Sequence, residues 1–427
     1  MPVFRYDAQW DIPRIRPTPV TAPAVDPQSL VLIPACALAA PLLADRLDRW
    51  LAVPTVVFEI VLGVLVGPDV LGWANVGDLL NTLSQFGLAM LMFLAGYELD
   101  FVRLRGGPIR RAGASWLVTL TVALGAGALA DRSALDGTFA GLALTTTALG
   151  TILPVLRDAG DLPTPFGAMA MATGAVGEFG PIIAVALLLS GNAPARSAVI
   201  LAAFAVLAGV ALAYARRPRP AWMSRLIGRT LRTSGQFAVR TVMLVLAAMV
   251  ATAIWLDLDM LLGAFTAGII SGLLLADVPE AAEEVIEAKL EGIGFGFLVP
   301  VFFVVSGMNF DLKALLDDPG TLLLLPAFLL LFLLLRGLPA ALLAPAALGR
   351  RDRVALGLYA ATALPLVVVI TTIEVEAGHL HSSTAAALVG AGMLSVLLFP
   401  LLAQRLRGGA APPTPHPDGP RVHAESW

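Results

Sequence analysis

Two charged residues stand inside long apolar segments, where a charge is costly. Glu178 lies in "MATGAVGEFGPIIAVALL" and Arg336 in "LLLFLLLRGLPAALLAP". A carboxylate can take up a proton or a cation, whereas an arginine stays protonated and acts only as a fixed positive charge. The structural alternatives are a carboxylate held by hydroxyls or a basic residue, and an arginine that caps carbonyls freed by interrupted helices.

The composition shows what surrounds these charges. Of the 427 residues, 58% are hydrophobic and only 14% are charged, far below the roughly 25% charged residues of a typical soluble domain. A bilayer span needs about 20 mainly apolar residues. The sequence predicts an all-α polytopic membrane protein whose thirteen spans lie at residues 29–45, 53–71, 83–99, 111–130, 136–156, 165–190, 196–215, 237–256, 259–276, 293–309, 320–346, 353–374 and 383–404.

Basic residues are distributed unequally between the two sides of these spans. Apart from Arg240 and Arg336, 20 of the other 26 lysines and arginines fall in the odd-numbered connections or the C-terminal tail. Cytoplasmic loops collect basic residues, so the N-terminus is predicted outside and the C-terminus inside. Residues 1–27 and 406–427 are rich in proline and are predicted to be disordered tails around a membrane domain at 28–405.

The odd number of spans places spans 1–6 and 8–13 in opposite orientations, with span 7 as a linker. Inverted repeats of this kind carry interrupted helices at corresponding positions, close to the binding site. Span 5 contains "LTTTALGTILP", which ends at Pro154, and span 12 contains "ATALPLVVVITT", with Pro365. We therefore predict two broken helices at Pro154 and Pro365; the alternative is two ordinary proline kinks.

Glu178 lies thirteen residues into span 6, about 20 Å along a helix that rises 1.5 Å per residue. This depth is near the middle of the bilayer, where acidic residues mark ion or proton pathways. Glu59 and Glu98 lie in or at the end of spans 2 and 3, where they either line an access funnel or fix helix contacts. His379 and His381 lie outside the membrane in a spacing that fits no established metal motif.

Several function classes are excluded or disfavoured. Cys36 is the only cysteine, which rules out an internal disulfide or a cysteine metal cluster. No basic patch suggests nucleic acid. No nucleophile with its base, metal motif or phosphate loop occurs in the spans, so we expect neither an enzyme nor a bound cofactor. A non-transporting membrane receptor remains an alternative.

Four motifs in order resemble one family of transporters. These motifs are "VPTVVFEIVLGVLVGPDVLGW", "FGLAMLMFLAGYELD", "LTTTALGTILPVLRDAG" and "FLVPVFFVVSGMNFDLKAL". The set is similar to the monovalent cation:proton antiporter-2 family of bacterial sodium/proton and potassium/proton exchangers, over residues 29–405. The resemblance implies a homodimer in the bacterial inner membrane. It also implies a moving core of spans 4–6 and 11–13 against dimerisation spans 1–3 and 8–10.

The resemblance also assigns site residues. In the family, an acidic pair, or an amide followed by an acid, stands where this chain has Gly177 and Glu178. Glu178 then inherits the ion-binding role, and Gly177 cannot supply a second ligand. The family's hydroxyl-rich stretch corresponds to Thr146 and Thr147, and its basic residue to Arg336. A single carrier acid with an arginine implies electroneutral exchange of one cation for one proton.

These inferences combine into one predicted mechanism. Glu178 binds a proton from one side and a dehydrated cation from the other, and hydroxyls of Thr146, Thr147 and Thr173 complete the cation site with carbonyls freed near Pro154 and Pro365. Sodium, potassium and lithium all suit such oxygen ligands. The alternatives are a sodium- or proton-coupled carrier of an organic solute on a similar scaffold, and a gated cation efflux pathway.

Overall fold

The computed structural model describes twelve stretches of the chain, namely residues 26–48, 55–98, 106–130, 141–188, 194–217, 226–227, 229–231, 233, 235–276, 278–316, 319–376 and 380–408. Every regular element within these stretches is a helix. Most of the two predicted tails, at 1–27 and 406–427, lies outside the described residues, and so does His379.

Each of the thirteen predicted spans coincides with helical structure in the described part of the chain. Eight correspond to helices long and apolar enough to cross a bilayer. These are α1 (Pro27–Asp48), α3 (Asp78–Tyr97), α8 (Pro165–Leu188), α9 (Pro194–Ala215), α11 (Phe237–Trp255), α20 (Ser382–Arg407) and the two composite helices α13–η1–α14 and α16–η2–α17.

The two composite helices contain a π-helical turn. The first runs through α13 (Glu280–Ile293), η1 (Gly294–Leu298) and α14 (Val299–Met308), and the second through α16 (Pro319–Leu331), η2 (Phe332–Gly337) and α17 (Leu338–Leu342). Span 10, predicted at 293–309, is part of the first composite helix, because α13 continues without interruption through η1 into α14.

The other five spans are shorter, less apolar or interrupted. The helices α2 (Thr55–Val66) and α12 (Met260–Leu275) are short and apolar, and α5 (Gly107–Ala130) starts beside two arginines. The fifth span consists of a helical turn at 141–143 followed by α7 (Leu149–Asp158). The twelfth consists of α18 (Arg350–Ala360) and α19 (Pro365–Glu376), and the short α15 (Leu312–Leu316) precedes α16.

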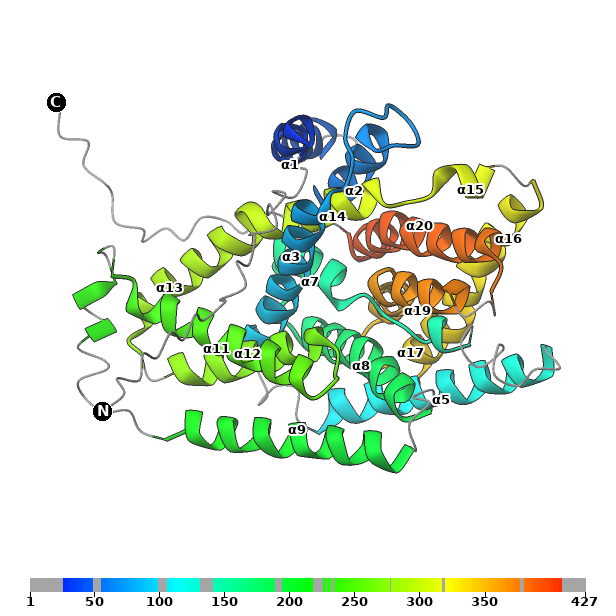
Figure 1. The fold of residues 1–427 in the computed structure, drawn as a ribbon. Coiled ribbons are helices and arrows are strands. Elements are labelled where there is room, and N and C mark those ends of the chain that lie inside the picture. The colour runs from blue at the N-terminus through cyan, green and yellow to red at the C-terminus, as the bar shows by residue number, and fades with distance from the viewer. Residues whose placement is uncertain are drawn as a thin grey trace, which may run out of the picture.

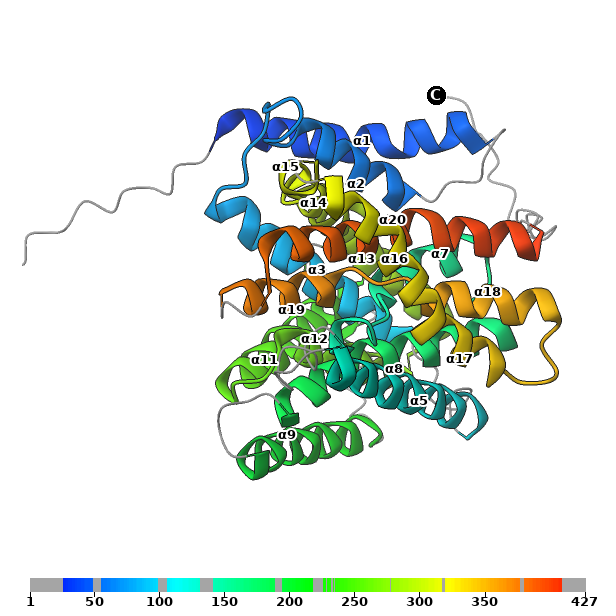
Figure 2. The same cartoon turned by 90° about the vertical axis from the view of Figure 1, so that its right-hand side faces the viewer.

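The helices form two bundles. In one bundle α1, α2, α3, α11, α12 and α14 pack on one another, and in the other α5, α8, α16, α17, α18 and α20 do so. Helix α9 contacts α8 and α12, and it lies at the opposite edge of the molecule from α1 in both Figure 1 and Figure 2. Of these twelve helices, five precede α9 in the chain and seven follow it, so each bundle combines helices from both parts of the chain.

Glycines allow the closest helix approach in the first bundle. A Cβ built on Gly96 of α3 would lie 2.1 Å from the carbonyl oxygen of Phe265, and one on Gly268 of α12 would lie 2.0 Å from that of Phe93. No side chain fits at either position. Small residues at such contacts are typical of membrane helices, whose association depends on close packing rather than on the hydrophobic effect.

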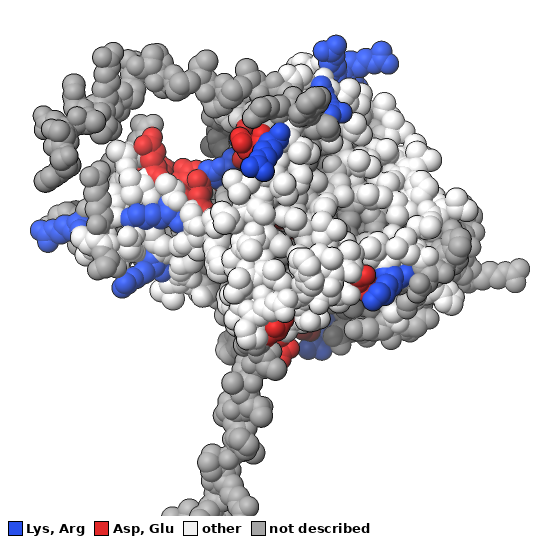
Figure 3. All heavy atoms as spheres, turned by 90° about the horizontal axis from the view of Figure 1, so that it is seen from above, with Lys and Arg blue, Asp and Glu red and all other residues white. Residues whose placement is uncertain are grey.

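The outer surface is apolar. Leu38 of α1 is 69% exposed and Leu323 of α16 is 75% exposed, and similar residues occur on α5, α9 and α11. Figure 3 shows one face that is largely uncharged, with most of its lysines, arginines and acids gathered toward one side. A bilayer is the environment in which such a surface is stable, so this is a multi-pass membrane protein.

The two interrupted helices occupy the fifth place in their respective repeats. Residues 146–148 and 362–364 have no regular structure, and helices lie on both sides of each. Pro365 is the first residue of α19, as a broken helix at this position requires. The prediction for Pro154 was wrong in position: α7 continues through Pro154, and the interruption lies six to eight residues earlier.

Candidate functional site

Glu178 lies in the middle of α8, against the start of α7. In a helix, residues four apart share a face, so Gly174 and Glu178 both face the same neighbour. A Cβ on Gly174 would lie 2.6 Å from the Leu149 side chain, so the glycine lets α7 begin directly beside the carboxylate. Glu178 is 0% exposed. The sequence therefore places one acid against a helix N-terminus in the protein interior.

The two carboxylate oxygens of Glu178 have different environments. Oε2 accepts a hydrogen bond of 2.8 Å from the backbone N–H of Leu149, the first residue of α7. The first N–H groups of a helix have no partner within the helix, and its N-terminus carries partial positive charge. Oε1 is buried and has no hydrogen-bond partner among the residues that the structure describes. One oxygen is therefore fixed by the broken helix, and the other is available for a proton or a cation.

Arg336 lies in the π-helical turn η2 and is also 0% exposed. A π-helical turn disturbs the regular hydrogen-bond ladder of its helix, and such turns are frequent at functional sites. The hydroxyl of Thr119, on α5, donates a 2.7 Å hydrogen bond to the carbonyl of Leu335, the residue before Arg336. Packing against α5 thus supports the backbone that carries the arginine.

The guanidinium of Arg336 connects three elements. Nε donates to the hydroxyl of Thr147 at 2.8 Å, Nη2 donates to the carbonyl of Thr173 at 2.8 Å, and Nη1 lies 3.5 Å from the hydroxyl of Ser115. No ion pair joins Arg336 to Glu178 among the described residues. Arg336 therefore fastens the first break to α8 without neutralising Glu178 by direct contact.

Gly177 lies where Thr147 and Arg336 meet α8. A Cβ at this position would lie 2.3 Å from the Thr147 hydroxyl oxygen and 2.7 Å from Arg336 Nη2. Residues 173 and 177 are four apart, so they share the face of α8 that receives the arginine. The space that a second ligand would need is already filled. The glycine next to Glu178 is thus a packing requirement of this particular arrangement.

The three threonines predicted for the site are buried but bonded differently. Thr147 donates its hydroxyl to the carbonyl of Ala360 at 2.7 Å while it accepts from Arg336. Thr146 donates its hydroxyl to Ala143 in its own turn at 2.9 Å. The hydroxyl of Thr173 is buried and has no hydrogen-bond partner in the described stretches of the chain. Thr147 and Thr173 lie together with Arg336, whereas the side chain of Thr146 makes no hydrogen bond to that group in the described part of the chain.

The second break lies directly behind the first. The backbone N–H of Ala148 donates to the carbonyl of Thr362 at 2.7 Å. The hydroxyl of Ser395, on α20, accepts from the N–H of Ala363 at 2.9 Å and donates to nearby carbonyls. Backbone groups left open by an interrupted membrane helix must find such partners. The backbone of one break therefore provides a hydrogen-bond partner for the backbone of the other at the place where the two helices cross.

Sequence reasoning missed several residues of this site. Ser115 and Thr119 of α5 and Ser395 of α20 are hydroxyls inside apolar spans, and that signal alone would have marked them. Asp259 is the N-cap of α12, where its side chain accepts from Leu261 N–H at 2.8 Å.

A second group of charges surrounds the far end of α7. Arg157 donates to Glu98 of α3 at 3.0 Å, pairs with Glu291 of α13 and lies 5.3 Å from the centre of the Phe295 ring. Glu98 thus fixes a contact between α3 and α7. Among the residues that the structure describes, no three His, Cys, Asp or Glu side chains are grouped to hold a metal ion.

The chain is similar to known cation/proton antiporters in sequence. The family described as "Sodium/hydrogen exchanger, transmembrane" matches residues 35–404. The "Putative Na(+)/H(+) antiporter YjbQ" of Bacillus subtilis is 27% identical over 399 residues, which cover 88% of this chain and 62% of that protein. The "Na(+)/H(+)-K(+) antiporter GerN" of Bacillus cereus is 27% identical over 62% of this chain and 68% of its own length. The chain thus spans less than two thirds of the first of these relatives.

One solved structure has a similar fold. The sodium proton antiporter MjNhaP1 of Methanocaldococcus jannaschii superposes with a TM-score of 0.58 at 14% sequence identity, over 89% of this chain and 99% of that one. At this identity the likeness concerns the fold alone. It confirms the all-α membrane architecture predicted from the sequence.

Proposed function

Because the chain belongs to the sodium/hydrogen exchanger family, we propose that it exchanges a monovalent cation for protons across the membrane at Glu178. The observation that carries this proposal is the carboxylate itself, fully buried, with one oxygen on the N–H of Leu149 and the other without a partner. Sodium is the expected cation, with potassium as the second choice, because relatives named for both occur among the matches.

Coupling follows from having one carboxylate for two ligands. A proton or a cation on Oε1 of Glu178 neutralises the site, whereas an empty, charged carboxylate in apolar surroundings is penalised by several kcal/mol. Only the loaded site crosses between the two sides. The Thr173 hydroxyl, which has no partner, and the Thr146 and Thr147 hydroxyls are the proposed additional cation ligands.

We assign the alternating movement to the two bundles. The bundle of α5, α8 and α16–α20, together with α7, carries Glu178, Arg336 and both breaks, and it corresponds to spans 4–6 and 11–13. The bundle of α1–α3 and α11–α14 would form the static, dimerising part, with the N-terminus outside a bacterial inner membrane and the C-terminus inside. The separate packing of the two bundles supports this division.

The exchange is expected to be electroneutral. With Gly177 beside Glu178, the moving site has one acid, and it is neutral both with a proton and with a monovalent cation. Arg336 keeps its charge in both crossings because it is bonded to Thr147 and to the Thr173 carbonyl. In proteoliposomes, clamping the membrane potential at zero or at a negative value should therefore leave the exchange rate unchanged. A rate that follows the potential would contradict the one-for-one stoichiometry.

The main test is proton flux in proteoliposomes with an imposed pH gradient, to which sodium, potassium or lithium is added. We expect at least one cation to collapse the gradient with wild-type protein and with Asp78→Asn, a control that removes an exposed acid at the start of α3. Glu178→Gln keeps the shape and an acceptor for the Leu149 N–H but should lose exchange at least about a hundredfold.

The same assay separates the alternatives. A carrier of an organic solute would leave the gradient intact when only inorganic cations are added. A gated cation pathway would pass cations without any proton movement. Exchange that survives in Glu178→Gln would move the carrier role to another residue.

A further inference from the structure

A second buried carboxylate without a partner lies away from the broken helices. Glu59, on α2, is 6% exposed, and no hydrogen bond or ion pair involves it among the described residues. Glu59 makes no hydrogen bond to any described residue of the Glu178 site. An ionised carboxylate among apolar groups is costly, so a cation bound beside Glu59 would be stabilised by its charge.

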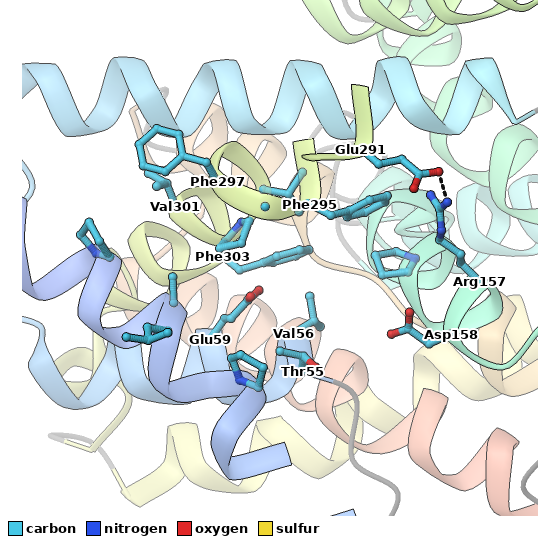
Figure 4. Close-up of a pocket in the computed structure, with 18 residues that line it drawn as sticks. Thr55, Val56, Glu59, Arg157, Asp158, Glu291, Phe295, Phe297, Val301 and Phe303 are labelled. Atoms are coloured by element: carbon cyan, nitrogen blue, oxygen red, sulfur yellow. Dashed lines mark hydrogen bonds and ion pairs between the residues drawn. The ribbon is translucent and has the colours of Figure 1, made fainter. Parts of the chain in front are cut away.

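Glu59 lines a cavity of about 600 Å³ between α1, α2, the end of α7 and the η1–α14 segment. Figure 4 shows its carboxyl group directed into this space, toward the ring of Phe303, with Arg157 and Asp158 on the far side. Small-molecule sites have volumes of roughly 300–1,000 Å³ and mostly apolar walls. The cavity therefore has the size of a site for an organic molecule.

The walls are apolar and aromatic. Prolines and aliphatic residues of α1 and α14 make up much of the lining, together with the rings of Phe295, Phe297 and Phe303. Phe297 lies in the π-helical turn η1 and is 49% exposed, so its ring is available to an occupant. Aromatic faces attract cations when these lie within about 6 Å of the ring centre.

The charge of the lining favours a cation over an anion. Three acids line the cavity, Glu59, Asp158 and Glu291, against one base, Arg157. Arg157 is already engaged by Glu98 and Glu291 and lies on the Phe295 ring. An anion would meet no free positive group on these walls, whereas a cation would meet the unpartnered carboxylate of Glu59.

An inorganic cation fits these walls poorly. Hard cations need several oxygen ligands close together, whereas Thr55 supplies the only hydroxyl among the described lining residues and Glu291, one of the three acids, is paired with Arg157. No cluster of three potential metal ligands occurs in the described part of the chain. An organic cation needs only one counter-charge, because its apolar body is satisfied by the proline, aliphatic and phenylalanine surfaces.

We propose that this cavity binds an organic monocation with an apolar body, a hydrophobic ammonium, whose charged head lies at Glu59 and whose body packs on the rings of η1 and α14. The site is separate from Glu178 and does not depend on the exchange reaction. Its walls come from α7 on one side and from α1, α2 and α14 on the other, so an occupant touches both bundles.

The test is equilibrium binding of radiolabelled benzyltrimethylammonium to the full-length protein in lipid nanodiscs. We expect saturable binding to wild type and to Asp78→Asn, which removes an exposed acid outside the cavity. Glu59→Gln, which keeps the side-chain volume, should weaken binding at least about tenfold, and Phe297→Leu should weaken it several-fold. Size-exclusion profiles establish that the variants remain folded.

A second measurement needs no variant. Neopentylbenzene has the shape of benzyltrimethylammonium without the charge, and it should fail to displace the labelled probe from wild-type protein. Equal binding to wild type and Glu59→Gln, or displacement by the neutral analogue, would overturn the proposal. Because Glu178→Gln should bind the probe like wild type, failure of the exchange hypothesis and failure of this one give different results.

Discussion

The two broken helices cross at the same place but have different neighbours. The first break, at 146–148, holds a carboxylate at the start of α7 and an arginine on its Thr147 hydroxyl. The second break, at 362–364, is met by backbone groups of the first and by the Ser395 hydroxyl. The two interruptions thus have different roles in the structure. The first contacts the charged groups, and the second makes hydrogen bonds between neutral groups that support the first.

This division explains why Arg336 and Glu178 can lie near one break without forming an ion pair. Each charged group is bonded to a different part of the first break, Arg336 to a side chain and Glu178 to a backbone N–H. Arg336 therefore joins the first break to α8, and Oε1 of Glu178 has no hydrogen-bond partner among the described residues.

After the loss expected for Glu178→Gln, the next largest effect is expected from Arg336, because its guanidinium bonds the first break to α8. Arg336→Met removes the donors to Thr147 and to the Thr173 carbonyl, and hydrogen bonds to charged groups contribute about 1.5–3 kcal/mol each. Cation-dependent proton flux should fall at least about tenfold. Arg336→Lys should recover it only in part, because one ammonium cannot reproduce the planar fork of donors. Proton flux at the wild-type rate in Arg336→Met would show that exchange does not need the hydrogen bonds between Arg336 and the first break.

A smaller effect is expected from added volume. Gly177→Ala puts a Cβ against Thr147 and Arg336, whereas Gly392→Ala meets one carbonyl oxygen of the second break, that of Ala363, at 2.8 Å. Overpacking costs about 1–3 kcal/mol, so thermal unfolding should shift down in both variants, and more in Gly177→Ala. Gly113→Ala on α5 has open space around its Cβ and serves as the control, neutral or slightly stabilising. Equal decreases of the unfolding temperature in Gly177→Ala and Gly392→Ala would show that the two breaks are packed equally tightly.

The smallest effects are expected from variants that remove a single hydroxyl beside one break or the other. Thr147→Val loses the bonds to Arg336 and to the Ala360 carbonyl, and it should reduce exchange about three- to tenfold. Ser395→Ala leaves the Ala363 N–H unpaired, so it should lower thermal stability by about 1–3 kcal/mol while the cation dependence of exchange is kept. Thr145→Val, whose hydroxyl bonds only within its own turn, is the matched control. A larger loss of cation affinity in Ser395→Ala than in Thr147→Val would assign ion binding to the second break.

Much of this site could be identified from residue type and depth. Glu178 and Arg336 stand out because a charge in an apolar span is costly, and Pro365 marks the start of α19 because proline suits the first turn of a helix. Pro154 led to a wrong position for the first break, because a proline was taken to mark the end of a helix. Proline is tolerated inside membrane helices, and here the helix continues through it while the break precedes α7.

The sequence by itself determined the membrane environment, the repeat of spans and the two residues that carry charge to mid-bilayer, since hydropathy and charge cost are properties of each segment alone. Only the tertiary structure decided that Arg336 bonds to Thr147 rather than to Glu178, that Gly177 is filled by its neighbours, and that Glu59 faces a cavity. These facts depend on contacts between segments that are distant in the chain, such as Thr147 and Arg336, which are 189 residues apart, and no local pattern encodes such contacts.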